Sequence, residues 1–160
     1  MWASLRHALH LETANSRILE LAQTDLLTDL ANRRAFTKRL SMAFTAAWRG
    51  APPFAVLYLD IDNFKDVNDT LGHAMGDLLL KEVVNRLRNA VRPDDLVARF
   101  GGDEFAILLL GVTDPAEIEE FATRIGKLLA APFSIKGHKV RITSSIGMSS
   151  IRPRSPGPRR

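Results

Sequence analysis

Apolar residues change their spacing several times along this chain, and the changes predict alternating helices and strands. Residues 54–60 form a nearly continuous apolar run, which is typical of a central strand covered on both faces. From Gly76 to Ala90 the apolar residues recur at helical spacing. Residues 96–100 and 105–110 are strand-like runs around two glycines, which predicts a β-hairpin. Together these elements predict an α/β or α+β fold with one sheet layer.

Capping and turn residues mark further boundaries. Asp114, Pro115 and Glu117 occupy the N-cap, first and third positions of a helix, which is a strong start signal. Weaker signals predict three more features: a helix capped by Thr24-Asp25, a helix from Asn32 to Ala47 that ends before Pro52-Pro53, and a final strand from Lys139 to Ile151.

The chain divides into a leading helix, a folded domain and a tail. The spacing of apolar residues predicts a helix over residues 2–23. The apolar stripe of this helix includes Leu11 and Ile18, which are one heptad apart. Both a coiled coil and a plain amphipathic lead-in helix fit this pattern. We therefore assign residues 1–22 to a signalling helix and residues 23–151 to the domain. Residues 152–160, rich in proline and arginine, are expected to be disordered.

Composition and charge narrow the class of protein. At 160 residues, with 46% hydrophobic and 25% charged, the chain suits one soluble globular domain. It has no cysteine, which excludes disulfides and thiolate metal sites, and it has no apolar run long enough to cross a membrane. The net charge is +4, and the four arginines after Ile151 account for all of it. Residues 1–151 are therefore formally neutral. We therefore predict a cytoplasmic protein that does not bind nucleic acid.

Three acidic residues are candidates for chemistry. Asp60 ends the apolar strand, and Asp103 and Glu104 lie in the hairpin turn. If the hairpin lies beside the strand, the carboxylates converge and repel one another unless a cation lies between them. Oxygen ligands of this kind suit Mg²⁺ or Mn²⁺. For each acid alone, a turn or capping role is the commoner explanation, and Gly101-Gly102 is equally a good hairpin turn.

These candidate residues lie within a series of motifs that resemble those of a known family. The segment Arg99-Phe-Gly-Gly-Asp-Glu-Phe105 matches the signature that names the GGDEF family of diguanylate cyclases. Four further segments resemble the family at its own spacings: Asp25 to Arg34, Asp60 to Lys65, Asn68 to Asp77, and Thr143-Ser-Ser145-Ile146-Gly147. The resemblance covers roughly residues 22–150.

The resemblance implies a fold and a reaction. The family has a mostly antiparallel central sheet with flanking helices, similar to the palm of nucleotidyl cyclases and polymerases. It condenses two GTP molecules into cyclic di-GMP and releases two pyrophosphates. By this resemblance Asp60, the Ile61 carbonyl, Asp103 and Glu104 bind Mg²⁺ or Mn²⁺, two ions per site, and one of the last two acids helps to deprotonate the ribose 3′-hydroxyl.

The resemblance also implies substrate contacts. Asn68 and Asp77 correspond to residues that bind guanine, and a carboxylate suits the adjacent N–H donors of that base. The phosphates would lie near Phe64, Lys65, Gly101 and Gly102. Simpler roles remain open: Asp77 could cap the helix that begins after Gly76, and Lys65 could be a solvated surface lysine.

A second ligand site is implied by Arg92 and Asp95. They form an RxxD pattern with Asp95 six residues before Gly101, and at this spacing the family has its inhibitory product site. A guanidinium fork suits phosphate or guanine, and a carboxylate suits the guanine N–H edge. As a bare pattern, RxxD is more often a surface salt bridge.

The resemblance also implies a homodimer and a C-terminal helix. Each domain would hold one GTP, so catalysis needs a homodimer, and the leading helix would join an upstream sensor. The family's usual C-terminal helix, whose Lys and Arg contact the triphosphate, is absent, because the residues after Ser150 include three prolines. Its absence would expose apolar sheet surface and remove phosphate contacts. A cyclic di-GMP receptor and a GTP-binding signalling module without turnover therefore remain alternatives to a cyclase.

Overall fold

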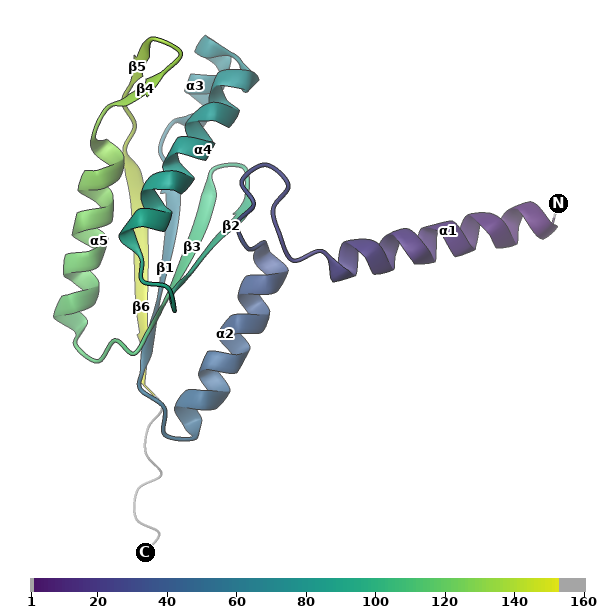
Figure 1. The fold of residues 1–160 in the computed structure, drawn as a ribbon, viewed down its shortest axis with the longest axis horizontal. Coiled ribbons are helices and arrows are strands. Elements are labelled where there is room, and N and C mark those ends of the chain that lie inside the picture. Colours follow the sequence, from purple (N-terminus) through teal and green to yellow (C-terminus); the bar gives the residue numbers. More distant parts are fainter. Residues whose placement is uncertain (1, 153–160) are drawn as a thin grey trace, which may run out of the picture.

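The computed structural model describes residues 2–152, which form a helix-flanked sheet preceded by a projecting helix (Figure 1). In chain order, the elements are α1 (Trp2–Leu21), α2 (Arg33–Trp48), β1 (Phe54–Ile61), α3 (Phe64–Leu71), α4 (His73–Ala90), β2 (Leu96–Gly101), β3 (Glu104–Leu110), α5 (Pro115–Ala130), β4 (Phe133–Ile135), β5 (His138–Val140) and β6 (Ser144–Ile151).

The main sheet has four strands in the order β2-β3-β1-β6, and every neighbouring pair is antiparallel. The predicted mostly antiparallel sheet flanked by helices is therefore confirmed. Because β1 lies between β3 and β6, residues at its end have neighbours on both sides. Asp60 lies opposite Glu104 on β3 and opposite Ser145 on β6. The predicted hairpin is also confirmed as β2 and β3.

The inner face of the sheet carries the main core. Leu57 and Leu59 of β1 are fully buried and pack in one cluster with Leu80 of α4 and Ile125 of α5. The start of α5 is as predicted, because the Asp114 side chain accepts a hydrogen bond from the N–H of Ala116. This packing fixes β1 along its length and so determines where the strand delivers Asp60.

The outer face is only partly covered. Helix α2 packs against β2 and β3 and forms a second cluster there, which includes Phe36 and Leu108. On β1, however, Tyr58 is 38% exposed, and Met148 of β6 is also exposed. The prediction that β1 is covered on both faces is therefore wrong for this half of the sheet. The expectation of exposed apolar sheet surface is confirmed at these two residues.

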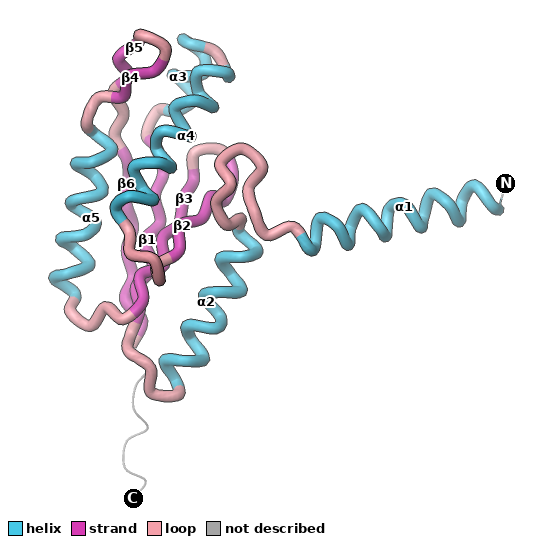
Figure 2. The backbone as a smooth tube through the Cα atoms, in the orientation of Figure 1, coloured by secondary structure: helices cyan, strands magenta, loops and turns pink. Residues whose placement is uncertain are grey.

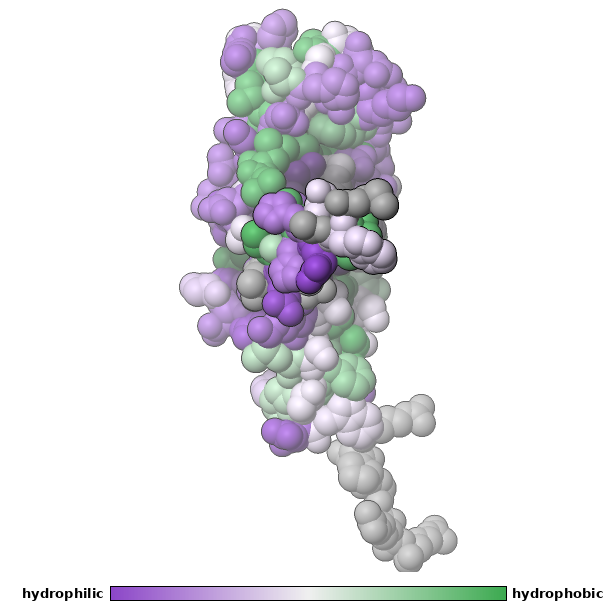
Figure 3. Space-filling model, turned by 90° about the vertical axis from the view of Figure 1, so that its right-hand side faces the viewer, coloured by the Kyte–Doolittle hydropathy of each residue, from purple (hydrophilic) through white to green (hydrophobic). Residues whose placement is uncertain are grey.

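Helix α1 confirms the predicted leading helix and projects away from the sheet (Figure 1). It carries both apolar and polar residues on its surface, as the view along it shows (Figure 3). Leu5, Leu9, Leu11 and Ile18 are all more than half exposed. Such a helix leaves its apolar side chains free for a partner, so the choice between a coiled coil and a lead-in helix stays open.

Several local predictions are wrong. Thr24 and Asp25 do not cap a helix; they begin a turn that Asp25 closes through side-chain bonds to Thr28. The helix expected after Gly76 begins three residues earlier, at His73, so Asp77 lies inside α4 and is not its cap. The strand expected from Lys139 to Ile151 is broken at residues 141–143 into β5 and β6.

Two elements were not anticipated. The sequence did not predict the short helix α3, nor β4, which pairs with β5 in a small hairpin. The hairpin and α3 lie at the same end of the molecule (Figure 2). The tail predicted to be disordered lies, apart from Arg152, outside the described residues. Within the described part, the structure has no helix with both the length and the apolar character of a membrane span.

Candidate active site

The predicted acidic residues meet at one end of the sheet. Asp60 lies near the end of β1, and the β2–β3 turn brings Asp103 and Glu104 to the same end. The Ile61 N–H donates to the Asp103 carbonyl at 3.2 Å, which ties the strand to the turn. Gly101 and Gly102 both have positive φ, of 131° and 50°, so this turn depends on glycine. The sheet register thus produces the convergence that sequence alone could not show.

The electrostatics of this cluster centre on Asp60. Burial, contact with the Asp103 carboxyl and repulsion from Glu104 and Asp62 together raise the pKa of Asp60. Its Oδ1 atom is buried and has no hydrogen-bond partner within the described residues. A buried acceptor without a donor is costly. The arrangement therefore favours a cation or proton beside Asp60.

The donor set suits a hard divalent cation that is shared with substrate. No group of three or more acidic or histidine side chains within residues 2–152 is arranged to hold a metal by itself. Mg²⁺, however, is usually held by one or two carboxylates, with water and substrate phosphates completing the shell. Asp60, whose unpartnered oxygen is buried, lies close to the Asp103 carboxyl, so these two carboxylates could supply such a partial set.

Tyr58 is a neighbour of the cluster that the motifs did not indicate. It lies two residues before Asp60, on the same face of β1. Desolvation and a hydrogen bond to Glu104 raise the pKa of the Tyr58 phenol, so it is a neutral donor at physiological pH. Tyr58 therefore places a neutral phenol close to the Glu104 carboxylate on the half-exposed outer face.

The residues expected near the phosphates lie in the first turn of α3. Phe64 is buried beneath the helix, whereas Lys65 is exposed. Asn63, just before them, has φ of 56°, in the left-handed region that asparagine tolerates. The chain therefore turns sharply after Ile61, which places α3 directly beyond the acidic cluster. Lys65 is free to meet an anion there.

The two residues expected to contact guanine come from different helices. Asn68 lies on α3 and Asp77 on α4, and Asp77 is exposed. The Asn68 amide lies against the backbone of Gly76: a Cβ built on Gly76 would be 1.8 Å from Asn68 Oδ1. Gly76 thus provides the space in which Asn68 sits, a role the sequence did not reveal.

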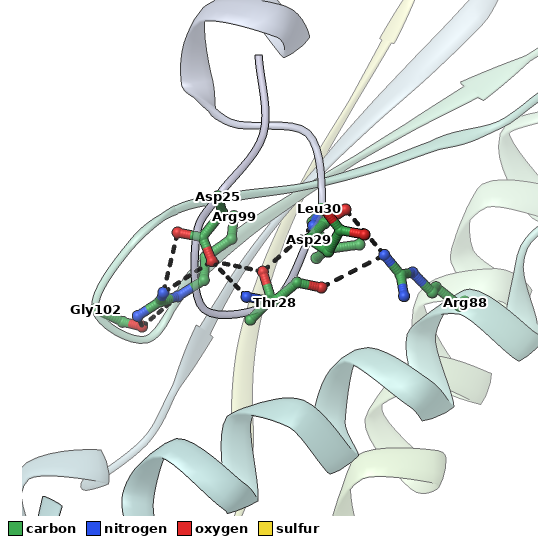
Figure 4. Close-up of polar contacts among 7 residues, drawn as sticks. All are labelled: Asp25, Thr28, Asp29, Leu30, Arg88, Arg99 and Gly102. Atoms are coloured by element: carbon green, nitrogen blue, oxygen red, sulfur yellow. Dashed lines mark hydrogen bonds and ion pairs between the residues drawn. The ribbon is translucent and has the colours of Figure 1, made fainter. Parts of the chain in front are cut away.

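The opening motif is linked to the signature turn through Arg99 (Figure 4). The Arg99 guanidinium donates to both carboxylate oxygens of Asp25, at 3.1 and 3.0 Å, and to the Gly102 carbonyl at 2.8 Å. Burial alone would raise the pKa of Asp25, but hydrogen bonds from Thr28 and Arg99 outweigh it and lower that pKa. The loop after α1 therefore holds the turn that carries Asp103.

A second arginine holds the same loop from the other side. Arg88 of α4 donates to the Thr28 and Asp29 carbonyls, at 3.4 and 3.0 Å (Figure 4). These contacts join residues about 60 positions apart, so no local pattern indicates them.

The RxxD pair lies at the far end of β3 from the acidic cluster. The Asp95 side chain is only 1% exposed: its carboxylate accepts hydrogen bonds from the Arg92 guanidinium and from the Leu110 N–H. Arg92 itself is 60% exposed and also donates to the Leu110 carbonyl. A shallow cavity beside the pair is lined further by Phe121 and Arg124 of α5, which the sequence did not single out. Asp95 therefore orients Arg92, and Arg92 and Arg124 remain available to a ligand.

Comparison with known proteins identifies the family. A family model described as "Diguanylate cyclase, GGDEF domain" matches residues 22–157. This chain belongs to the GGDEF family. The GGDEF chain is 45% identical over 142 residues to the bifunctional diguanylate cyclase/cyclic di-GMP phosphodiesterase MucR of Pseudomonas aeruginosa. The match covers 89% of this chain but 21% of that relative, so the chain spans about a fifth of its length.

Solved structures of other GGDEF proteins share the fold. One, comprising only the GGDEF domain of TpbB from Pseudomonas aeruginosa, has a TM-score of 0.76 and 41% identity, covering 79% of this chain and 74% of that one. Another contains the coiled coil and GGDEF domain of DgcB from Caulobacter crescentus in complex with c-di-GMP. Its TM-score is 0.75 at 29% identity, covering 97% of this chain and 81% of that one.

Proposed function

We propose that this GGDEF domain is a diguanylate cyclase that condenses two GTP molecules into cyclic di-GMP. The 3′-hydroxyl oxygen of each GTP attacks the α-phosphate of the other. Two phosphodiester bonds form and two pyrophosphates leave. Acidic residues of the site accept the two hydroxyl protons. Such a reaction depends mainly on positioning and on neutralising charge. The observation that carries the proposal is the convergence of Asp60, Asp103 and Glu104 around a buried, unpartnered carboxylate oxygen.

The acidic cluster would bind the divalent metal and accept a proton. Asp60, the Ile61 carbonyl, Asp103 and Glu104 are the ligands, consistent with the general use of Mg²⁺ or Mn²⁺ by diguanylate cyclases. When bound, the metal supplies positive charge against the phosphates and lowers the pKa of the attacking hydroxyl. One acid of the Asp103–Glu104 pair takes the hydroxyl proton, and the neutral Tyr58 phenol lies close to Glu104.

The two helices beyond β1 would bind the nucleotide. Asn68 and Asp77 contact the guanine edge, where Asp77 accepts the adjacent N–H donors that adenine lacks. Lys65, Phe64 and the backbone of Gly101 and Gly102 lie toward the phosphates. Gly76 supports this assignment, since it leaves room for the Asn68 amide between α3 and α4.

The complete reaction would require two copies of the domain, because each supplies one half of the site. The exposed apolar residues of α1 suit self-association, and α1 would transmit a signal from an upstream sensor. The DgcB structure, described as a coiled coil and GGDEF domain, supports this arrangement. GTP as substrate accords with the predicted cytoplasmic location.

Product formation from GTP with Mg²⁺ tests the proposal. After bound nucleotide is stripped, we expect cyclic di-GMP to be detected by chromatography with the wild-type chain. The Asp103→Ala variant should lose activity by about 10²–10³-fold, the scale of removing a preorganised electrostatic group. A folded wild-type protein that binds GTP and Mg²⁺ but forms no product would refute the cyclase assignment.

A catalytically impaired domain that binds cyclic di-GMP is the second candidate. The half-covered outer face at Tyr58, together with the exposed Arg92 and the cavity it shares with Arg124, favours it. In this case, as in product inhibition of an active cyclase, Arg92→Ala should weaken cyclic di-GMP binding about tenfold or more by calorimetry. Arg152→Ala, which removes an exposed arginine elsewhere, is the matched control. Unchanged binding in Arg92→Ala would exclude this site for the product.

A further inference from the structure

We propose that Asp62 is a positioning residue, held by the hydroxyls of Thr143 and Ser145, that fixes the turn between the acidic cluster and α3. This inference rests on the proposed cyclase function and adds to the same site. It gives a role to the Thr143-Ser-Ser145 segment, which the motifs placed in a late strand without a function.

Three hydrogen bonds tie Asp62 to the segment at the start of β6. Thr143 Oγ1 donates to Asp62 Oδ2 at 2.7 Å, and Ser145 Oγ donates to Asp62 Oδ1 at 2.7 Å. The Asp62 N–H donates to the Thr143 carbonyl at 2.9 Å. Hydroxyl bonds to a carboxylate at this distance are among the stronger hydrogen bonds in proteins. One residue is thus fixed through both its backbone and its side chain.

The position of Asp62 makes this tie relevant to the site. It follows Asp60 and Ile61 directly, and it precedes Asn63, whose left-handed conformation starts α3 without a side-chain cap. On the other side, the Ile61 N–H is held by the Asp103 carbonyl. The turn is therefore anchored to the signature hairpin at Ile61 and to β6 at Asp62. Loosening the second anchor would let the Ile61 carbonyl and Lys65 shift relative to Asp103.

The alternative is that Asp62 is itself a metal ligand, as an Asp-x-Asp spacing would indicate. In the structure both its oxygens already accept hydroxyl hydrogen bonds. The two roles make opposite predictions for the hydroxyls. If Asp62 were a ligand, removing its donors would free it and leave the metal site intact. If Asp62 positions the turn, removing the hydroxyls has the same effect as removing Asp62.

The experiment compares three variants of the full chain: Asp62→Ala, the pair Thr143→Val with Ser145→Ala, and all three changes together. We expect kcat to fall on the order of 10²-fold with a smaller change in KM, because displaced groups still bind substrate but misalign it. The hydroxyl pair should reproduce Asp62→Ala, and the triple variant should lose nothing more. The melting temperature should fall by only about 2–4 °C, because the bonds are exposed. Ser149→Ala, an exposed serine on the same strand, is the matched control.

Hydrogen–deuterium exchange of residues 60–66 provides a readout independent of turnover. Exchange should be faster in all three variants and unchanged in Ser149→Ala. Loss of activity in Asp62→Ala but not in the hydroxyl pair would overturn the proposal and indicate a direct ligand. Unaltered exchange and activity in every variant would also overturn it. If the wild type makes no product, the cyclase assignment fails, while the exchange measurement still decides whether Asp62 holds the turn.

Discussion

At the scale of single residues, the site depends on small features that control where a functional side chain can lie. Asp95 orients Arg92, and Gly76 leaves space for the Asn68 amide. In both cases one residue controls where the side chain of a predicted ligand-binding residue lies. Substitutions at such positions should change function more than stability.

Gly76→Ala tests this most directly. The added Cβ would meet the Asn68 amide, so we expect Asn68 to be displaced and the binding of a non-hydrolysable GTP analogue to weaken about tenfold. Gly126→Ala in α5 is a matched control, since its Cβ would meet only Ile146 Cδ1, at 3.9 Å. It should stabilise the fold by up to about 1 kcal/mol without altering binding. Calorimetry that shows equal affinity for Gly76→Ala and wild type would contradict this role of Gly76.

At the scale of elements, the hairpin of the signature is held by a loop from the other end of the domain. Asp25 and Arg99 lie 74 residues apart, and both are less than a fifth exposed. Their pairing joins the loop after α1 to the turn at Gly102. A movement of α1 would therefore reach the acidic cluster through this contact.

The pH dependence of stability follows from the same pair. The folded state lowers the pKa of Asp25. The ionised Asp25 carboxylate therefore adds to the free energy of unfolding above the ordinary Asp pKa, and this stabilisation is lost as pH falls through the lowered pKa. Asp25→Asn should lower the free energy of unfolding by about 1–3 kcal/mol at pH 7, and the difference should shrink below about pH 4. Denaturant titrations from pH 3 to 7 measure it. Asp29→Asn, at an exposed position in the same loop, should show no such difference. A loss of unfolding free energy in Asp25→Asn that does not depend on pH would refute the lowered pKa of Asp25.

At the scale of the whole molecule, the projecting helix and the proposed half site together favour assembly. Leu11 and Ile18 of α1 are both exposed and lie one heptad apart. The domain carries one acidic cluster, whereas the proposed reaction joins two nucleotides. Activity should therefore rise more steeply than linearly with protein concentration until the dimer forms.

The combined change Leu11→Glu and Ile18→Glu should weaken self-association, because two charges would be placed on the apolar seam. We expect sedimentation to show more monomer and product formation to fall about tenfold or more at low protein concentration. Thr13→Glu, on the opposite side of the same helix, should leave both unchanged. A monomeric wild type whose activity is strictly linear in concentration would contradict assembly through α1.

The sequence by itself determined the features that depend on neighbouring residues. The apolar run of β1, the glycine turn between β2 and β3 and the capped start of α5 are all as predicted, since each follows from local spacing and turn chemistry. The motifs also identified the family and the residues to examine. Local patterns failed where short segments have no clear period, as in α3 and the β4–β5 hairpin.

Only the tertiary structure decided which distant residues meet. The register of β1 with β3 brings Asp60 opposite Glu104, and the register with β6 brings the hydroxyls of Thr143 and Ser145 to Asp62. The space for Asn68 beside Gly76 likewise comes from the packing of α3 on α4. Such contacts depend on how buried faces fit together, and a sequence period reports only which face is buried.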